Sequence, residues 1–351
     1  MNLLDSGGIK VEPLKCLRGE YYHNECSLCI DICPTNAVSL VSKRISVESN
    51  ICTSCNACIG VCPTSTLINS GFDTSAYIIK NGLGKELNMT CDSGKNCISI
   101  FKSEELISLG LRAKSVTCDM SQCNECKLNI DGKVSNSIIK NIEEANRFLQ
   151  DINRAPIFIN NKKIEISRRQ AFKSFAKDIN ALDVQEDNID TLFDPKETLP
   201  RSRVIFQNSL KAAAETLPEE KINDKFSFFT HKKIDFKSCD NCGDCIQFCP
   251  TNALSFGGDK TKILFMQLRC IACGICDDIC KQRSFSSDDS FDVVSLAFNR
   301  AEVLIENHFE VCSECKVSFP QKGNEKICKR CIDFANAHSS LFALARDIKQ
   351  D

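Results

Sequence analysis

The cysteines of this chain are spaced in ways that suit metal coordination. Three stretches carry the complete spacing C-x2-C-x2-C-x3-C: Cys52, Cys55, Cys58 and Cys62; Cys239, Cys242, Cys245 and Cys249; Cys270, Cys273, Cys276 and Cys280. This spacing is typical of cubane iron–sulfur ligation, because a tight loop wraps three corners of the cluster and directs backbone N–H groups at its sulfurs. The chemistry that it predicts is one-electron transfer.

A fourth stretch lacks its first cysteine. Cys26, Cys29 and Cys33 keep the spacing, but His23 stands where the first ligand is expected, and Cys16 lies ten residues before Cys26. Histidine does ligate iron in Rieske centres, whereas thiolate is the usual ligand of a cubane. We favour Cys16, returned to the site by the intervening segment "LRGEYYHNE". His23 would then donate a hydrogen bond nearby or be exposed.

The paired motifs resemble the bacterial two-[4Fe–4S] ferredoxins over residues 16–68 and 239–286. The segments "CPTNAVSL" (33–40) and "CPTNALSF" (249–256) repeat each other with two conservative changes. The resemblance implies that the fourth cysteine of each motif ligates the other cluster. The implied sets are Cys52, Cys55 and Cys58 with Cys33; Cys26, Cys29 and Cys62 with Cys16 or His23; Cys239, Cys242 and Cys245 with Cys280; Cys270, Cys273 and Cys276 with Cys249. Lys281 stands where proline is usual. We expect this change to disturb the backbone of the turn more than the ligation of the cluster.

Five more cysteines lie in a segment that predicts a strand, a helix and a second strand. The segments 85–97 and 113–126 flank the helical pattern 103–112, and a right-handed crossover would make the two strands parallel. Their carboxyl ends would meet at the edge where open α/β sheets form sites. The candidate ligands there, for zinc or a further cluster, are Cys91, Cys97, Cys118, Cys123 and Cys126; we favour Cys97, Cys123 and Cys126.

Two other interpretations of these cysteines stay open. Cys118, Cys123 and Cys126 have the plant-type [2Fe–2S] spacing, although no further cysteine follows before Cys239. Alternatively, the alternation along the two strands makes Cys91 and Cys118 buried small side chains without a ligand role.

The C-terminal region contains two C-x2-C pairs, twelve residues apart: Cys312 and Cys315, then Cys328 and Cys331. Two such knuckles form a closed tetrahedral S4 site, which resembles a zinc ribbon and implies one zinc ion; rubredoxin-type iron uses the same ligands. His308 and His338 lie outside the pairs. A helix is predicted at 332–348, packed against the ribbon.

Composition narrows the function classes. The chain has 351 residues, 25 cysteines and a net charge of −2, which gives no electrostatic reason to expect nucleic acid as a partner. We find no secretion signal and no apolar run that could span a membrane, so we expect a cytoplasmic metalloprotein. Without a GxGxxG, a P-loop or a nucleophile–base set, we assign no catalytic residue.

We expect an α+β multidomain architecture. The cysteine-free region predicts helices at 136–153 and 167–182, the second with a capping box of Ser167 and Gln170, and an acidic linker at 183–202. The expected parts are a ferredoxin-like dicluster module (1–80), a small α/β domain (81–165), a helical linker (166–225), a second dicluster module (226–300), and a zinc ribbon with a helix (301–351).

The function that these parts predict is electron transfer through four [4Fe–4S] clusters, with one zinc. The module order resembles multi-ferredoxin proteins that accompany bacterial molybdenum-type oxidoreductases, which implies an accessory subunit or carrier with a redox enzyme as partner. Two alternatives remain: a regulatory or assembly protein whose clusters report on oxygen or iron, and an enzyme that binds substrate at an incompletely ligated cluster.

Overall fold

The computed structural model describes residues 8–91, 96–161, 193 and 197–338, and the chain forms two compact units. The first unit comprises Met1–His231, Gln267–Cys273 and Asp289–Arg300, and the second Lys232–Met266, Gly274–Asp288 and Ala301–Asp351. These units differ from the five expected parts, because three segments of the expected second module, 226–231, 267–273 and 289–300, belong to the first unit.

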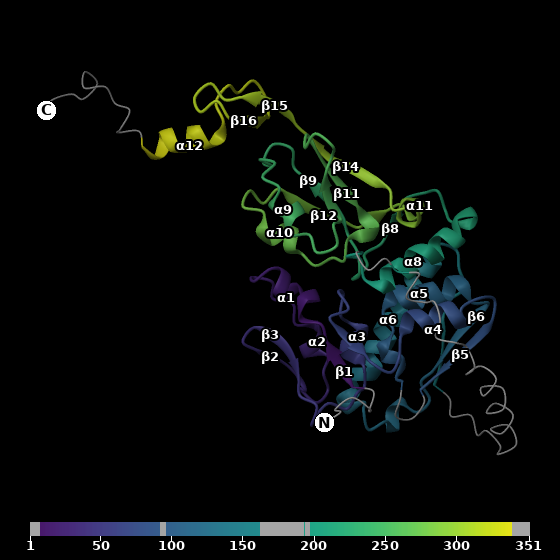
Figure 1. Cartoon of the computed structure of the whole chain (residues 1–351). Helices are drawn as coiled ribbons and strands as arrows, with labels where there is room; N and C mark the ends of the chain where they lie inside the picture. The colour runs from purple at the N-terminus through teal and green to yellow at the C-terminus, as the bar shows by residue number, and fades with distance from the viewer. Residues whose placement is uncertain (1–7, 92–95, 162–192, 194–196, 339–351) are drawn as a thin grey trace, which may run out of the picture. The chain divides into compact units, whose positions relative to one another are not determined.

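The N-terminal part of the first unit is built from short elements around the cysteine motifs (Figure 1). Strand β1 pairs antiparallel with β4, and β2 pairs antiparallel with β3 as a hairpin. The elements are β1 (Ile9–Val11), α1 (Leu17–Glu20), α2 (Leu28–Asp31), β2 (Val38–Val41), β3 (Arg44–Val47), α3 (Ala57–Gly60), β4 (Leu67–Asn69) and α4 (Thr74–Asn81).

The predicted strand–helix–strand segment is confirmed. Strands β5 (Glu86–Thr90), β6 (Ser115–Asp119) and β7 (Phe158–Asn160) form a parallel sheet in the order β5-β6-β7. Helix α5 (Ser103–Arg112) makes the crossover, and it starts with a Glu105 carboxylate that accepts the Lys102 N–H at 2.9 Å. The helix predicted at 136–153 is α6 (Lys133–Asp151).

The core of the first unit is aromatic. Helix α8 (Arg201–Ala212) buries Phe206 against Phe148 of α6, whose ring also stacks on Phe291 at a centroid distance of 5.6 Å. The region expected to be a helical linker thus contributes a core helix, because its apolar residues have partners on α5 and α6. Short pieces complete this unit: β8 (Ile222–Asn223), β13 (Ser290–Phe291), which pairs with β8, and α11 (Val293–Ala297).

The second unit repeats the arrangement of short elements. Strand β9 pairs with β12, and β10, β11 and β14 form an antiparallel sheet. The elements are β9 (His231–Ile234), α9 (Asp244–Gln247), β10 (Leu254–Phe256), β11 (Lys262–Met266), α10 (Ile275–Ile279), β12 (Phe285–Asp288), β14 (Ala301–Glu306), β15 (His308–Val311), β16 (Ser318–Gln321) and α12 (Lys329–Ala337).

Three further expectations can be placed. The helix predicted at 167–182, with its capping box, lies outside the described residues. Helix α12 covers the first part of the helix predicted at 332–348, and none of its residues is buried, so its described part does not pack in the expected way. Among the described helices, none has both the length and the apolar character needed to cross a bilayer.

Candidate iron–sulfur and metal sites

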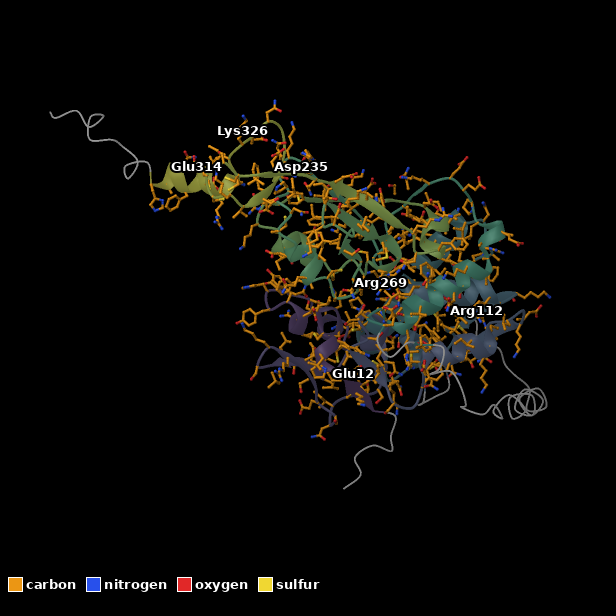
Figure 2. All side chains as sticks on the ribbon, turned by 45° about the horizontal axis from the view of Figure 1, so that its top comes forward. Glu12, Arg112, Asp235, Arg269, Glu314 and Lys326 are labelled. Atoms are coloured by element: carbon orange, nitrogen blue, oxygen red, sulfur yellow. The ribbon has the colours of Figure 1, made fainter. Side chains whose placement is uncertain are left out.

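Each pair of cysteine motifs lies between two paired strands. In the first pair, Glu12 after β1 donates its N–H to the Thr66 carbonyl at 2.7 Å. In the second, Asp235 after β9 donates to the Ser284 carbonyl at 2.8 Å. Glu12 and Asp235 are both labelled in Figure 2. Because each pair also encloses a hairpin, β2–β3 or β10–β11, the two regions have the same local topology.

The three complete motifs share a loop conformation. Each C-x2-C-x2-C loop has two residues with positive φ, one on either side of its second cysteine: Ser54 and Asn56, Asn241 and Gly243, Ala272 and Gly274. Alternation of this kind turns successive N–H groups inward and makes an anion-binding concavity. The loops can therefore surround the sulfurs of a cluster. In the incomplete motif, Ser27 has a φ of −126°, so this loop differs.

The turn after the fourth cysteine is the same in all four motifs. The N–H four residues on donates to the Sγ atom at 3.2–3.4 Å: Ala37 to Cys33, Thr66 to Cys62, Ala253 to Cys249 and Ser284 to Cys280. The residue before that donor has a φ of 50–55°: Asn36, Ser65, Asn252 and Arg283. The turn at Lys281 is therefore retained without proline, and the expected disturbance of its backbone is absent.

Threonine adds a hydroxyl to three of these turns. In the CPT sequences the Oγ1 atom lies 3.7–3.9 Å from the Sγ atom two residues earlier: Thr35 near Cys33, Thr64 near Cys62 and Thr251 near Cys249. Hydrogen bonds to the sulfurs stabilise the reduced cluster and so influence its potential. The repeated CPT triplet is the sequence signal for this role, and the cysteine spacing alone does not reveal it.

The thiols of the first module converge in two crossed groups. The neighbours whose charge acts on Cys58 include Cys55, Cys52 and Cys33, which is the predicted set. Burial first, and then the charges of Cys62, Cys26 and Cys16, raise the pKa of the Cys29 thiol to about 12. Thiols so close together resist ionisation unless a cation is bound, as metal ligation supplies.

The structure brings Cys16, and not His23, to the thiol group of Cys26 and Cys29. Cys16 acts electrostatically on both of these cysteines. The His23 ring is exposed and packs edge-on against Tyr21 and Tyr22. The inserted segment is held on the motif by Arg18, whose Nε donates to the Cys26 carbonyl at 2.7 Å.

Cys16 also occupies the position that Cys239 has in the second module. Each lies four residues after the N–H that joins the outer strands, at Glu12 or Asp235. The sequences Lys10-Val11-Glu12 and Lys233-Ile234-Asp235 repeat at this offset. This second repeat is a sequence signal for Cys16 that is overlooked when only the cysteines are compared.

One complete thiol group is described in the second module. Burial first, and then the charges of Cys242, Cys239 and Cys280, raise the pKa of the Cys245 thiol to about 12. These four cysteines are the set that the crossover predicts. The set of Cys270, Cys273, Cys276 and Cys249 includes residues of both units and stays a prediction from the spacing.

Two buried cations near the motifs were not found from the sequence. Burial raises the pKa of the Cys62 thiol, but the charge of Lys102 and the hydrogen bonds in the turn bring it below its ordinary value. Lys102 is buried and donates to the Ser65 hydroxyl at 3.0 Å. Arg203 is fully buried and donates to the Cys270 carbonyl at 3.2 Å. Both cations would favour negative charge on a cluster bound at the neighbouring cysteines.

The C-terminal cysteines form the tightest group. The Sγ atoms of Cys312, Cys315, Cys328 and Cys331 all lie within 4.8 Å of one another. Two of these Sγ–Sγ distances are 3.9 Å, between Cys312 and Cys331, and 3.7 Å, between Cys315 and Cys328. The Cys328 N–H donates to the Cys312 Sγ atom at 3.3 Å and, as the first cause, lowers the pKa of that thiol to about 6. This arrangement suits a single tetrahedral ion.

The middle cysteines divide into a group of four and one core residue. Cys91 and Cys97 are in hydrogen-bond contact, and both Cys123 and Cys126 act electrostatically on Cys91. Cys118 is fully buried in β6, opposite Met89 of β5, and burial alone raises its pKa to about 12. This burial agrees with the interpretation of Cys118 as a small core side chain, and the plant-type spacing stays a prediction from the sequence.

Comparison with known proteins agrees with the motif chemistry. Residues 231–281 match the family model described as a 4Fe-4S dicluster domain. A 65-residue stretch is 35% identical to the ferredoxin-type protein NapH of Haemophilus influenzae; it covers 17% of this chain and 23% of that protein. The chain is thus similar to less than a quarter of that relative. These findings show one region similar to a ferredoxin-type 4Fe-4S dicluster domain, at residues 231–281.

Proposed function

We propose that the chain carries four [4Fe–4S] clusters in two dicluster modules and transfers electrons to or from a larger redox enzyme, as an accessory subunit or a carrier in the cytoplasm. The observation that carries this proposal is the crossed convergence of thiols outside the matched domain. Cys33 lies with the cysteines of the following motif, and Cys62 lies with those of the preceding one. Crossed ligation of this kind is typical of ferredoxin modules with two clusters.

Contacts within the first unit support a path for electrons. The Cys29 thiol of one proposed cluster acts on Cys58 of the next, so the two clusters of the module would be neighbours. Asn24, which accepts the Cys26 N–H at 3.1 Å, also donates to the Cys273 carbonyl at 3.4 Å. The backbone of Cys273, which belongs to the same unit, is thereby joined through one side chain to the loop of Cys26.

The C-terminal group is proposed to hold one structural zinc ion. A tetrahedral ion with Zn–S bonds of about 2.3 Å places its sulfurs about 3.8 Å apart. The observed distances of 3.7 and 3.9 Å agree with that geometry. All four ligand positions are filled by protein, so such an ion would stabilise the hairpin of β15 and β16 and the start of α12 and would have no open site for catalysis.

Four thiols around the first cluster also argue against an enzyme with an open iron at that position. With Cys16 in the group, Cys26, Cys29 and Cys62 would complete a fully cysteine-ligated cubane. Such clusters serve electron transfer more readily than substrate binding, because no iron is left without a protein ligand.

The test is a reductive titration of the anaerobically purified full-length protein, followed by EPR, with reoxidation by a one-electron acceptor. We expect several reduced-cluster signals that interact magnetically, and full recovery on reoxidation. Irreversible cluster loss during the cycle, coupled to altered binding of a partner protein, would contradict electron transfer and favour a regulatory role. Binding of small ligands to one iron would instead favour an enzyme.

A further inference from the structure

The four middle cysteines outside the strands form a site that the two dicluster modules do not use. Cys91 follows directly on β5, and Cys97 precedes the short helix Ile98–Ile100. Cys123 and Cys126 bracket one turn after β6, and the Cys126 N–H donates to the Cys123 carbonyl at 3.3 Å. Because β5 and β6 are parallel neighbours, both loops leave the same edge of the sheet.

The loop that carries Cys123 and Cys126 is held in place by its own hydrogen bonds. The Asn129 amide donates to the Cys123 carbonyl and to the Ser135 hydroxyl, each at 3.0 Å. Cys97 and Cys123 are both partly buried and pack on the core of the unit. Cys97 and Cys123 are therefore positioned by the fold, and Cys126 ends the turn that begins at Cys123.

The four thiols interact with one another through a hydrogen bond and through their charges, as the thiols of a metal site do. Cys91 and Cys97 share a hydrogen bond, and the charges of Cys97 and Cys126 both act on Cys123. Four thiolates gathered in a partly buried site repel one another, and a bound cation removes that cost. Within the described residues, the group whose ligand atoms all lie within 4.8 Å is the C-terminal one, so the middle four are spread more widely than the ligands of one ion.

The site adjoins the second cluster of the first module. The charge of Cys97 acts on Cys55, a proposed ligand of that cluster, and the Ser99 hydroxyl donates to the Cys55 carbonyl at 2.5 Å. Gly60 permits this approach, because a Cβ atom there would lie 2.0 Å from the Ser99 carbonyl oxygen. A redox-active centre with Cys97 as a ligand would therefore lie next to the proposed cluster of Cys55.

We propose that Cys91, Cys97, Cys123 and Cys126 hold a fifth iron–sulfur cluster, which exchanges single electrons with the cluster of Cys55. In this exchange one cluster is oxidised as the other is reduced by one electron, and no bond is made or broken. The spread of the thiols favours a sulfide-bridged cluster over one zinc ion. This centre adds to the four proposed clusters, and its electron exchange rests on the proposed cluster of Cys55.

The test compares full-length variants after anaerobic reconstitution with iron and sulfide. The double variant Cys97→Ala/Cys123→Ala removes two proposed ligands, and Cys118→Ala, in the neighbouring core, is the matched control. We expect the double variant to lose about two to four irons per chain with an equal number of sulfides, as for a [2Fe–2S] or [4Fe–4S] cluster. Its zinc content should stay constant, and the control should keep all its iron.

Two results would overturn the proposal: unchanged iron in the double variant, or the loss of one zinc with iron unchanged. Because the double variant could fold poorly, Cys126→Ser is measured as well, and the EPR signals of the other clusters serve as the check on folding. Retention of those signals with loss of the extra iron separates this proposal from that of the four clusters. If the wild-type protein lacks the EPR signals of the four clusters, that result would instead contradict the proposed function.

Discussion

The two regions that carry paired cysteine motifs differ chiefly before the first cluster. In the second module two residues separate Cys239 from Cys242, whereas in the first module nine residues separate Cys16 from Cys26. The insertion forms the short helix α1 and is fixed by Arg18 on the Cys26 carbonyl. The strands, hairpins and turns around both regions are nonetheless equivalent. The strand pairing, and not the loop spacing, therefore sets the positions of Cys16 and Cys239.

The largest effect should come from Cys16. The variant Cys16→Ala should lose one cubane, about four irons per chain, because it removes the thiol equivalent to Cys239. The iron and sulfide content after anaerobic reconstitution measures this loss of one cluster directly. His23→Ala is the matched control and should retain all its iron. If the histidine variant loses the cluster and the cysteine variant keeps it, the equivalence of Cys16 and Cys239 is wrong.

A smaller effect should follow from Lys102, whose buried charge acts on Cys62. Reduction adds a negative charge to the cluster, and a nearby cation stabilises that state. Lys102→Gln should therefore lower the midpoint potential of one cluster. The expected shift corresponds to a free energy on the order of 1–2 kcal/mol, the Coulomb energy of two unit charges roughly 10 Å apart at an effective dielectric of 20. A potentiometric titration followed by EPR measures the shift.

Lys43→Gln is the control for that variant, because Lys43 is exposed on the hairpin of the same module. It should leave all potentials in place. A potential that stays constant in Lys102→Gln, or shifts equally in both variants, would show that the buried lysine does not tune the first module.

The hydroxyl in the CPT turn should have a weaker influence. Thr64→Val removes the group 3.7 Å from the Cys62 Sγ atom and should lower the same midpoint potential by about 0.5–1.5 kcal/mol, the net contribution of one hydrogen bond. Thr64→Ser keeps a hydroxyl and should restore most of the potential. Equal shifts in the valine and serine variants would mean that packing of the side chain, and not its hydrogen bond, sets the potential.

The smallest effect is expected at Lys281, the position where the second module departs from proline. The turn there already has the hydrogen bond and the positive φ of the other three turns. Lys281→Pro should therefore leave the iron content unchanged and alter the free energy of unfolding by less than about 1 kcal/mol. Thermal unfolding under anaerobic conditions tests this, and loss of a cluster would show that the turns are not equivalent.

Much of the local structure followed from the sequence because the cysteine spacing and the period of apolar residues act over short distances. The parallel pair of β5 and β6 and helix α6 are examples. The role of α8 did not follow, since nothing local to 201–212 indicates that Phe206 meets Phe148. The same holds for Lys102, whose charge acts on Cys62 through a contact distant in the sequence, next to its hydrogen bond to Ser65.

The middle cysteines show where spacing alone fails. The sequence favoured Cys97, Cys123 and Cys126 and left Cys91 and Cys118 equal, because both alternate with apolar residues on their strands. The structure separates them: β5 ends at Thr90, so Cys91 is in the loop, whereas Cys118 is inside β6. A difference of one residue in where a strand ends thus separates Cys91, a proposed ligand, from Cys118, a core side chain.

The central claim is that residues 16–68 form a second dicluster module in addition to the matched domain. The most direct measurement is the iron and sulfide content of the Cys97→Ala/Cys123→Ala variant, in which the middle site cannot contribute. Two modules predict about sixteen irons per chain with sulfide to match, beside one zinc. About eight irons, with the first-module cysteines titrating as free thiols, would contradict that claim.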